Sequence, residues 1–227
     1  MNNPLFIIDI IKVLANKVGF EIRRTRTLPA NASFMKQFLY FDRMYKKISG
    51  VEGDIVECGV GKGRTFLALA FLASQEGKGR KLWGFDSFEG FPEPSQEDIS
   101  FRNPKRGDWS GYEITIKHIY SILNGASINK DFVRNNIKIV KGFFNQTLPS
   151  FGAPIAFLHI DADLYDSYKN VLKILFPKVV KGGIVLFDEY KTDKWPGATK
   201  AVDEFFADKP YKIQKDERAS KYFLVKI

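Results

Sequence analysis

Residues 55–65 read IVECGVGKGRT, and this stretch decides the fold. The apolar residues that lead into it predict a strand, and the apolar run 66–73 after it predicts a helix. Three glycines lie between them at alternate positions, Gly59, Gly61 and Gly63. Glycine allows a sharp turn and lets a ligand approach the backbone near the amino end of the helix. We therefore expect a nucleotide-like ligand over this turn, with a structural turn that binds nothing as the alternative.

Two acidic residues narrow the choice of ligand. Glu57 precedes the first glycine, and a second predicted strand, residues 81–85, is followed by Asp86. A carboxylate at the end of the neighbouring strand can accept two hydrogen bonds from ribose hydroxyls. Dehydrogenases place a pyrophosphate over such a turn, whereas S-adenosylmethionine carries a cationic sulfonium and no phosphate. The acidic surroundings favour the cation, and Glu57 before the turn resembles the class I S-adenosylmethionine methyltransferases.

The rest of the chain alternates strands with helices. Further strands are predicted at 137–140, 155–160 and 184–187, the last one after a Gly182–Gly183 turn. Helices are predicted at 34–48, 114–123, 131–135, 165–175 and 198–206, and a closing antiparallel hairpin at 211–214 and 222–225. This order predicts an α/β fold with a doubly wound, mostly parallel, seven-stranded sheet.

A second group of acids follows two of these strands. Asp161 and Asp163 come after residues 155–160, and Asp188 and Glu189 come after residues 184–187. The carboxyl ends of parallel strands open onto one crevice, so we expect these side chains to meet there. Gathered carboxylates repel one another unless a cation compensates them, and Mg²⁺ prefers oxygen ligands. The alternatives are that Asp163 caps the helix beginning at Tyr165 and that the others are solvated.

Composition limits the broad class of protein. The 227 residues include 35 Lys and Arg against 26 Asp and Glu, giving a net charge of +9. Such an excess fits nucleic acid, a membrane surface or an anionic substrate, but no basic block is dense, so solvated helix faces are the simpler interpretation. Cys58 is the single cysteine, which excludes an internal disulfide and favours a reducing, cytoplasmic location.

Two segments lie outside the strand–helix pattern. Residues 1–33 form a predicted helical and basic segment, whose apolar part, residues 4–18, is expected to bury against the domain or a second subunit of a homo-oligomer. Membrane-surface contact aided by Arg23, Arg24 and Arg26 is the alternative. Residues 95–112 are a long polar loop, which we expect to act as a lid on the substrate side.

Six motifs in order carry a family resemblance: VECGVGKG, GFDSFEGFP, KGFFNQTLP, IDADLYDS, PKVVKGGIVLFDEY and PGATKAVDEF. Over residues 31–206 the chain resembles the macrocin O-methyltransferase (TylF/MycF) family. The resemblance implies a class I methyltransferase domain, here residues 34–227, that uses S-adenosylmethionine and Mg²⁺ to methylate a sugar hydroxyl. The acceptor would be a small-molecule sugar, glycoside or sugar nucleotide.

The resemblance also implies roles for residues. Asp161, Asp188 and Glu189 would hold the metal, Asp161 would act as the base, Asp86 and Ser87 would bind the ribose, and Phe144 the adenine. Glu57, Gly59, Gly61 and Gly63 complete the expected cofactor site. Two departures stand out, since the family often has Trp and Arg where this chain has Gly61 and Lys62, and a second Asp where it has Glu189.

Rival functions make different demands on the sequence. Nucleic-acid methyltransferases that act on amino groups need an Asn/Asp-Pro-Pro-aromatic turn after the strand that corresponds to residues 155–160. This chain has Asp-Ala-Asp-Leu there, so we expect no nucleic-acid partner. Catechol-type enzymes share the metal logic but usually have a lysine where Leu164 stands. Non-catalytic binding of S-adenosylmethionine would leave the acidic edge without a purpose. His159 is expected to be packed or hydrogen-bonded, and His118 is a candidate contact for the acceptor.

Overall fold

The structure is a computed structural model that describes residues 32–111 and 113–227. The apolar stretch 4–18 and the arginines predicted to contact a membrane surface lie outside these residues. Among the described helices, none has the length and apolar character needed to cross a membrane.

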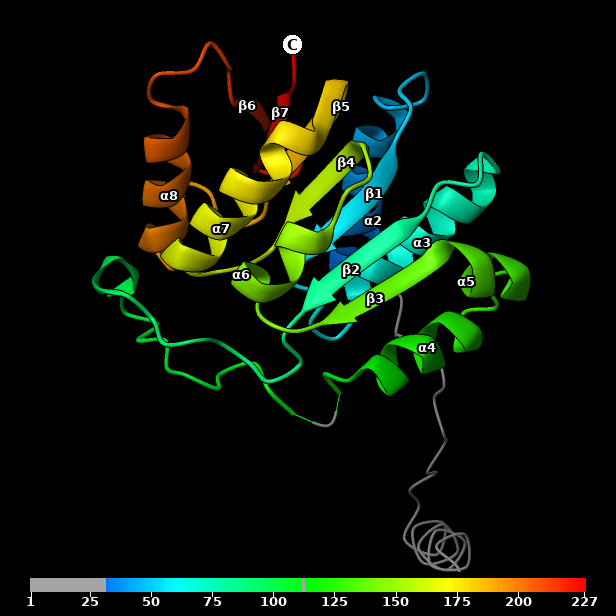
Figure 1. Cartoon of the computed structure of the whole chain (residues 1–227), viewed down its shortest axis with the longest axis horizontal. Helices are drawn as coiled ribbons and strands as arrows, with labels where there is room; N and C mark the ends of the chain where they lie inside the picture. Colours follow the sequence, from blue (N-terminus) through cyan, green and yellow to red (C-terminus); the bar gives the residue numbers. More distant parts are fainter. Residues whose placement is uncertain (1–31, 112) are drawn as a thin grey trace, which may run out of the picture.

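A seven-stranded sheet with the order β3-β2-β1-β4-β5-β7-β6 forms the centre (Figure 1). Its strands are β1 Asp54–Cys58, β2 Leu82–Asp86, β3 Ile137–Lys141, β4 Ile155–Ile160, β5 Val179–Phe187, β6 Gln214–Asp216 and β7 Lys221–Val225. Neighbouring strands from β3 to β5 run parallel, whereas β7 is antiparallel to both β5 and β6. The predicted doubly wound sheet with a C-terminal hairpin is confirmed.

Helices cover both faces of the sheet. They are α2 Ala32–Lys46, α3 Arg64–Glu76, α4 Ile116–Gly125, α5 Lys130–Asn136, α6 Phe144–Thr147, α7 Tyr165–Leu175 and α8 Pro196–Phe206. In Figure 1, α7 and α8 lie in front of the sheet and α2 and α3 lie behind it. Short 3-10 helices occur at Gln96–Asp98, Leu148–Ser150 and Phe176–Lys178.

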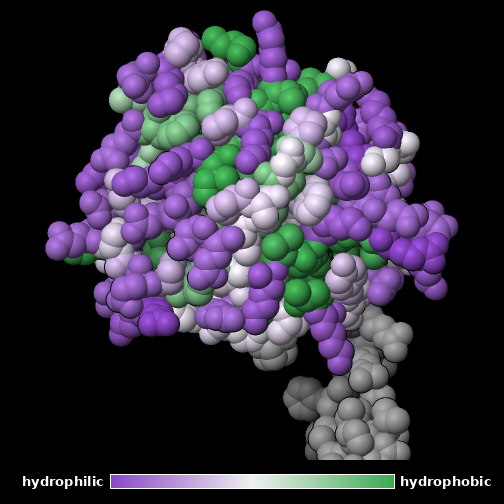
Figure 2. All heavy atoms as spheres, in the orientation of Figure 1, coloured by the Kyte–Doolittle hydropathy of each residue, from purple (hydrophilic) through white to green (hydrophobic). Residues whose placement is uncertain are grey.

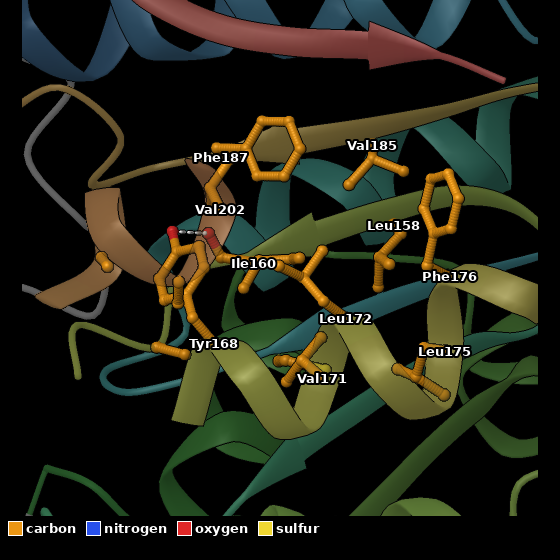
Figure 3. Packing of buried hydrophobic residues seen from close by; sticks show 14 of the residues in the cluster. Leu158, Ile160, Tyr168, Val171, Leu172, Leu175, Phe176, Val185, Phe187 and Val202 are labelled. Carbon is orange, nitrogen blue, oxygen red and sulfur yellow. Dashed lines mark hydrogen bonds between the residues drawn. The ribbon is translucent and has the colours of Figure 1, made fainter. Parts of the chain in front are cut away.

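Strand alternation divides the apolar residues between two cores. Leu158 and Val185 point to the α7 and α8 side, where they join Leu172 and Phe176 (Figure 3). Phe157 belongs to the other core, under α2 and α3. Both faces of the central strands are therefore buried, as a parallel sheet covered by helices requires.

Most element boundaries differ from expectation by one to three residues, and the larger differences are in β5 and the hairpin. Gly182 and Gly183 lie inside β5 instead of forming a turn before it, because the Gly182 N–H donates to the Lys226 carbonyl (2.7 Å) and keeps the backbone in the sheet. The hairpin begins at Gln214 and not at residue 211, since the ring of Tyr211 packs on Phe176 with centroids 5.0 Å apart.

The long loop before α4 is tied to the domain. Asp98 is buried, and its Oδ1 accepts the Tyr165 N–H at 2.8 Å while its Oδ2 accepts the Ser95 N–H at 2.9 Å. Asp98 therefore caps the amino end of α7. The alternative prediction that Asp163 provides this cap is wrong, because Leu164 occupies the cap position and the carboxylate comes from Asp98.

A cavity made in the core around α7 is expected to lower the stability of the protein strongly. Leu172→Ala removes a fully buried side chain and should lower the free energy of unfolding by about 2–5 kcal/mol. The neighbouring Lys173 is exposed, so Lys173→Ala on the same helix is the matched control and should change stability by less than about 0.5 kcal/mol. Chemical denaturation of both variants measures the difference, and equal stabilities would contradict this assignment of the core.

Candidate active site

A cavity of about 920 Å³ opens at the carboxyl ends of the central strands. Its wall includes Gly59 and Gly61 after β1, Asp86 at the end of β2, Asp161 after β4 and Asp188 after β5. The cavity thus lies where ligands bind in open α/β sheets. Its volume is at the upper end for small-molecule sites and leaves room for a cofactor together with an acceptor.

The three glycines of the turn have different reasons to be glycine. A Cβ on Gly59 would stand 1.7 Å from the Asp161 carbonyl oxygen, and one on Gly63 would meet Ile119 at 2.6 Å. A Cβ on Gly61 would meet no described atom within 4 Å, although its φ of +52° still favours glycine. Gly59 and Gly63 therefore serve close packing, and Gly61 borders the open cavity.

Asp86 joins the glycine turn to the loop after β2. Its Oδ2 accepts the Gly61 N–H at 2.9 Å and its Oδ1 accepts the Phe88 N–H at 2.7 Å. Each carboxylate oxygen keeps a further lone pair for a ligand. Ser87 and Phe144, the other predicted cofactor contacts, also line the cavity, and the Ser87 hydroxyl donates to the Gly90 carbonyl at 2.8 Å.

Glu57 lies beneath the cavity and not in its wall. Its Oε1 is 3.0 Å from Nδ1 of His159, and among the described residues its buried Oε2 has no hydrogen-bond partner. Burial raises the pKa of Glu57 well above its usual range and lowers the pKa of His159 to about 4. His159 also meets the Phe41 ring edge-on at 5.0 Å, so the predicted packed and hydrogen-bonded histidine is confirmed.

His159, Asp161 and Asp188 form a compact group at the floor of the cavity. One potential ligand atom from each lies within 4.8 Å of the other two. Asp161 and Asp188 also line the cavity, as predicted, and so does Glu189. The Glu189 carboxylate contacts the hydroxyl of Tyr168 on α7 and borders the compact group, beside Asp161 and Asp188. The structure thus supplies His159 as a neighbour that the sequence prediction did not include.

Burial and mutual repulsion dominate the electrostatics here. Burial, and then the charges of Asp188 and Asp163, raise the pKa of Asp161 well above its usual range. Burial is the largest influence on the pKa of Asp188 and would raise it, but the Lys221 ammonium, His159 and the hydrogen bonds from Lys221 and Glu189 together lower that pKa overall. Lys221 Nζ is 2.7 Å from Asp188 Oδ1. The group therefore favours a bound positive charge.

The donor set suits a divalent cation. Two carboxylates and one imidazole offer ligand atoms within 4.8 Å of one another, and Nδ1 of His159 lies 3.0 Å from Glu57 Oε1. A metal-binding histidine commonly has its second nitrogen fixed by such a carboxylate. The residues present therefore fit the metal ion that the family resemblance implies.

His118, the predicted acceptor contact, and Lys62, a departure from the family pattern, lie away from the cavity floor. The backbone N–H of His118 donates to the Thr115 hydroxyl (3.1 Å) in the first turn of α4, and His118 is not among the described residues that line the cavity. Lys62 borders the cavity, where its ammonium pairs with Glu113 at 2.6 Å.

Several site residues were missed because they come from distant segments. Gln37 of α2 and the pair Lys194 and Trp195 before α8 line the cavity, and Lys221 of β7 reaches the acidic group from below. None belongs to a motif at the end of a parallel strand. Only the pairing of β7 with β5 could have indicated Lys221.

Comparison with known proteins identifies the family of the chain. Residues 40–217 match the family model described as Macrocin-O-methyltransferase (TylF). The chain belongs to this family. Demethyldecarbamoylnovobiocin O-methyltransferase of Streptomyces niveus is 31% identical over 207 residues, which cover 82% of this chain and 73% of that protein. Mycinamicin III 3''-O-methyltransferase of Micromonospora griseorubida is 27% identical over 165 residues, which cover 69% of this chain but only 61% of that protein.

Solved structures share the same architecture. A calicheamicin methyltransferase superposes with a TM-score of 0.77 at 25% identity, covering 99% of this chain and 94% of that one. The O-methyltransferase NovP superposes with a TM-score of 0.70 at 25% identity, covering 98% of each chain. With the family match, these findings make the chain an O-methyltransferase of the S-adenosylmethionine-dependent class.

The glycine turn yields a paired test. Gly59→Ala should lower the free energy of unfolding by more than about 4 kcal/mol, since the new methyl group would collide with the Asp161 backbone. Gly61→Ala should cost only about 1–2 kcal/mol for its positive φ, yet weaken S-adenosylmethionine binding roughly tenfold because the methyl group enters the cavity. Denaturation and titration calorimetry separate the two effects, and a stable Gly59→Ala variant would refute the close-packing role.

Proposed function

We propose that this O-methyltransferase methylates a hydroxyl of a sugar, in a deoxysugar, glycoside or sugar nucleotide, with the help of Mg²⁺ and the carboxylate of Asp161. The observation that carries the proposal is the compact group of His159, Asp161 and Asp188 on the floor of a cavity bordered by the glycine turn. Relatives named for sugar-bearing natural products, such as the Streptomyces olivaceus 4'-O-methyltransferase of a rhamnosyl-tetracenomycin, support the acceptor class.

We propose that S-adenosylmethionine occupies the part of the cavity that Gly61, Asp86 and Phe144 border. S-adenosylmethionine supplies an electrophilic methyl group when it is bound. Asp86 would accept hydrogen bonds from its ribose, Phe144 would lie against its adenine, and the space beside Gly61 would admit it close to the backbone. The acidic floor suits the cationic sulfonium of S-adenosylmethionine. The sulfonium, like a metal ion, would bring positive charge close to the crowded carboxylates.

Asp161 and Asp188 would hold Mg²⁺, which lowers the pKa of a bound hydroxyl when it is present. The resemblance implies Glu189 as the third ligand, and His159 is the second candidate because it also lies beside Asp161 and Asp188. Comparing the metal affinities of Glu189→Gln and His159→Gln decides between them. A metal held by three side chains leaves positions for two adjacent acceptor oxygens, which is why we propose a sugar with neighbouring oxygen substituents.

Asp161 would also take the proton of the reacting hydroxyl. It follows β4 directly, and its backbone N–H donates to the Cys58 carbonyl at 2.9 Å, so it lies beside both the glycine turn and the acidic group. A carboxylate so placed can act as general base on a hydroxyl presented in the cavity.

Metal removal tests the first part of the proposal. Thorough chelation should reduce methyl transfer to background, and added Mg²⁺ should restore it, because the acceptor hydroxyl otherwise keeps a pKa far above neutral. Formation of S-adenosylhomocysteine measures the rate. Full activity in a preparation in which no metal can be detected would eliminate the metal from the mechanism.

Acceptor screening with Asp161→Asn tests the second part. Turnover should occur on sugar nucleotides or glycosides, fall on matched acceptors lacking the neighbouring hydroxyl, and drop by about 10²-fold or more in Asp161→Asn, with S-adenosylmethionine affinity little changed. Asp166→Asn, which changes another cavity carboxylate of the same loop–helix segment, is the matched control. Turnover confined to catechols or RNA, or an Asp161→Asn variant as fast as wild type, would contradict the proposal.

A further inference from the structure

Lys221 connects the C-terminal hairpin to the acidic group. The register pairs Phe187 of β5 with Tyr222 of β7, so the next residues along the antiparallel pair, Asp188 and Lys221, stand opposite each other. Lys221 Nζ lies 2.7 Å from Asp188 Oδ1 and 2.9 Å from the Asp188 carbonyl oxygen. One ammonium therefore holds both the side chain and the backbone of a residue on the cavity floor.

The other acid close to Lys221 is already engaged. Asp216 of β6 pairs with Lys221 in the strand register, but its Oδ1 accepts from Arg43 Nη2 at 2.9 Å and from the Ala219 N–H at 2.8 Å. Arg43 belongs to α2 and neutralises Asp216 without the help of Lys221. The charge of Lys221 is thus left for Asp188 and the carboxylates beyond it.

This placement has two consequences for a divalent cation. Lys221 takes one lone pair of Asp188 Oδ1 and holds the ammonium on that side, which favours Oδ2 as the carboxylate oxygen that faces an ion. A fixed positive charge beside the site also repels the ion, and such repulsion is strong where water is largely excluded. The same charge keeps the crowded carboxylates compensated before any ion binds.

We propose that Lys221 is a positioning residue that fixes Asp188 and keeps the affinity of the site for divalent cations low, so that the ion is held firmly only when acceptor oxygens complete its shell. The inference rests on the proposed metal role of Asp161 and Asp188. If Lys221 only supported the structure, removing it would weaken divalent-cation binding. The inference predicts that removing Lys221 strengthens that binding.

The test is Mn²⁺ binding to the full chain, measured by calorimetry and by electron paramagnetic resonance without cofactor or acceptor. Lys221→Met should bind Mn²⁺ about tenfold more tightly than wild type or better, and Lys221→Gln should do the same if the methionine variant folds poorly. Lys221→Arg keeps the charge and should resemble wild type. Lys215→Met is the matched control, since Lys215 lies on the same hairpin and pairs with Glu217.

The outcomes separate this inference from the proposed metal site. Unchanged or weaker Mn²⁺ binding in folded Lys221→Met and Lys221→Gln overturns the role of Lys221. Wild-type affinity retained in both Asp161→Asn and Asp188→Asn instead overturns the metal site itself. If Lys215→Met binds Mn²⁺ as tightly as Lys221→Met does, the effect comes only from the change in net charge. That result would also overturn the inference.

Discussion

The close approach of β1 and β4 at Gly59 is the constraint on which the site depends. The backbone after β1 passes so near the Asp161 carbonyl that no side chain fits at residue 59. The Asp161 N–H bonds to the Cys58 carbonyl, and the Gly59 N–H bonds to the Phe85 carbonyl. These contacts fasten the ends of three strands together, so the glycine turn, Asp86 and the acidic floor all share one cavity. A wider spacing of the strands would separate the glycine turn from the acidic group.

The sequence predicted those parts of the site that follow directly from parallel strands. Asp86, Asp161 and Asp188 each follow or end a short apolar run, and a doubly wound sheet must bring such positions to one edge. The predicted doubly wound topology required no knowledge of side-chain contacts, because right-handed crossovers leave few alternatives. Motif order then supplied the family, which the comparison confirmed over residues 40–217.

The contacts that the sequence did not reveal depend on the register of distant strands and on the direction in which each side chain points. His159 and Glu189 both adjoin Asp161 and Asp188, but His159 is also held by Glu57 and Glu189 by Tyr168 of α7. Asp98 caps a helix 67 residues away, and Lys221 reaches Asp188 across an antiparallel pair. No local pattern encodes these contacts, since each is fixed only when the sheet and the long loop are assembled.

Asp98 anchors the long loop, and within a few residues of Asp98 the loop changes from buried to largely exposed. Asp98 fits only because residue 197 is glycine, where a Cβ would stand 2.1 Å from Asp98 Oδ1. On the far side of the anchor, Ile99 and Phe101 are 78% and 79% exposed, while Ser100 between them is tied to the Lys194 carbonyl. Surface positions of this kind tolerate replacement with little effect on folding. Mutational drift can therefore alter the outer chemistry of the loop while its path beside the cavity is preserved.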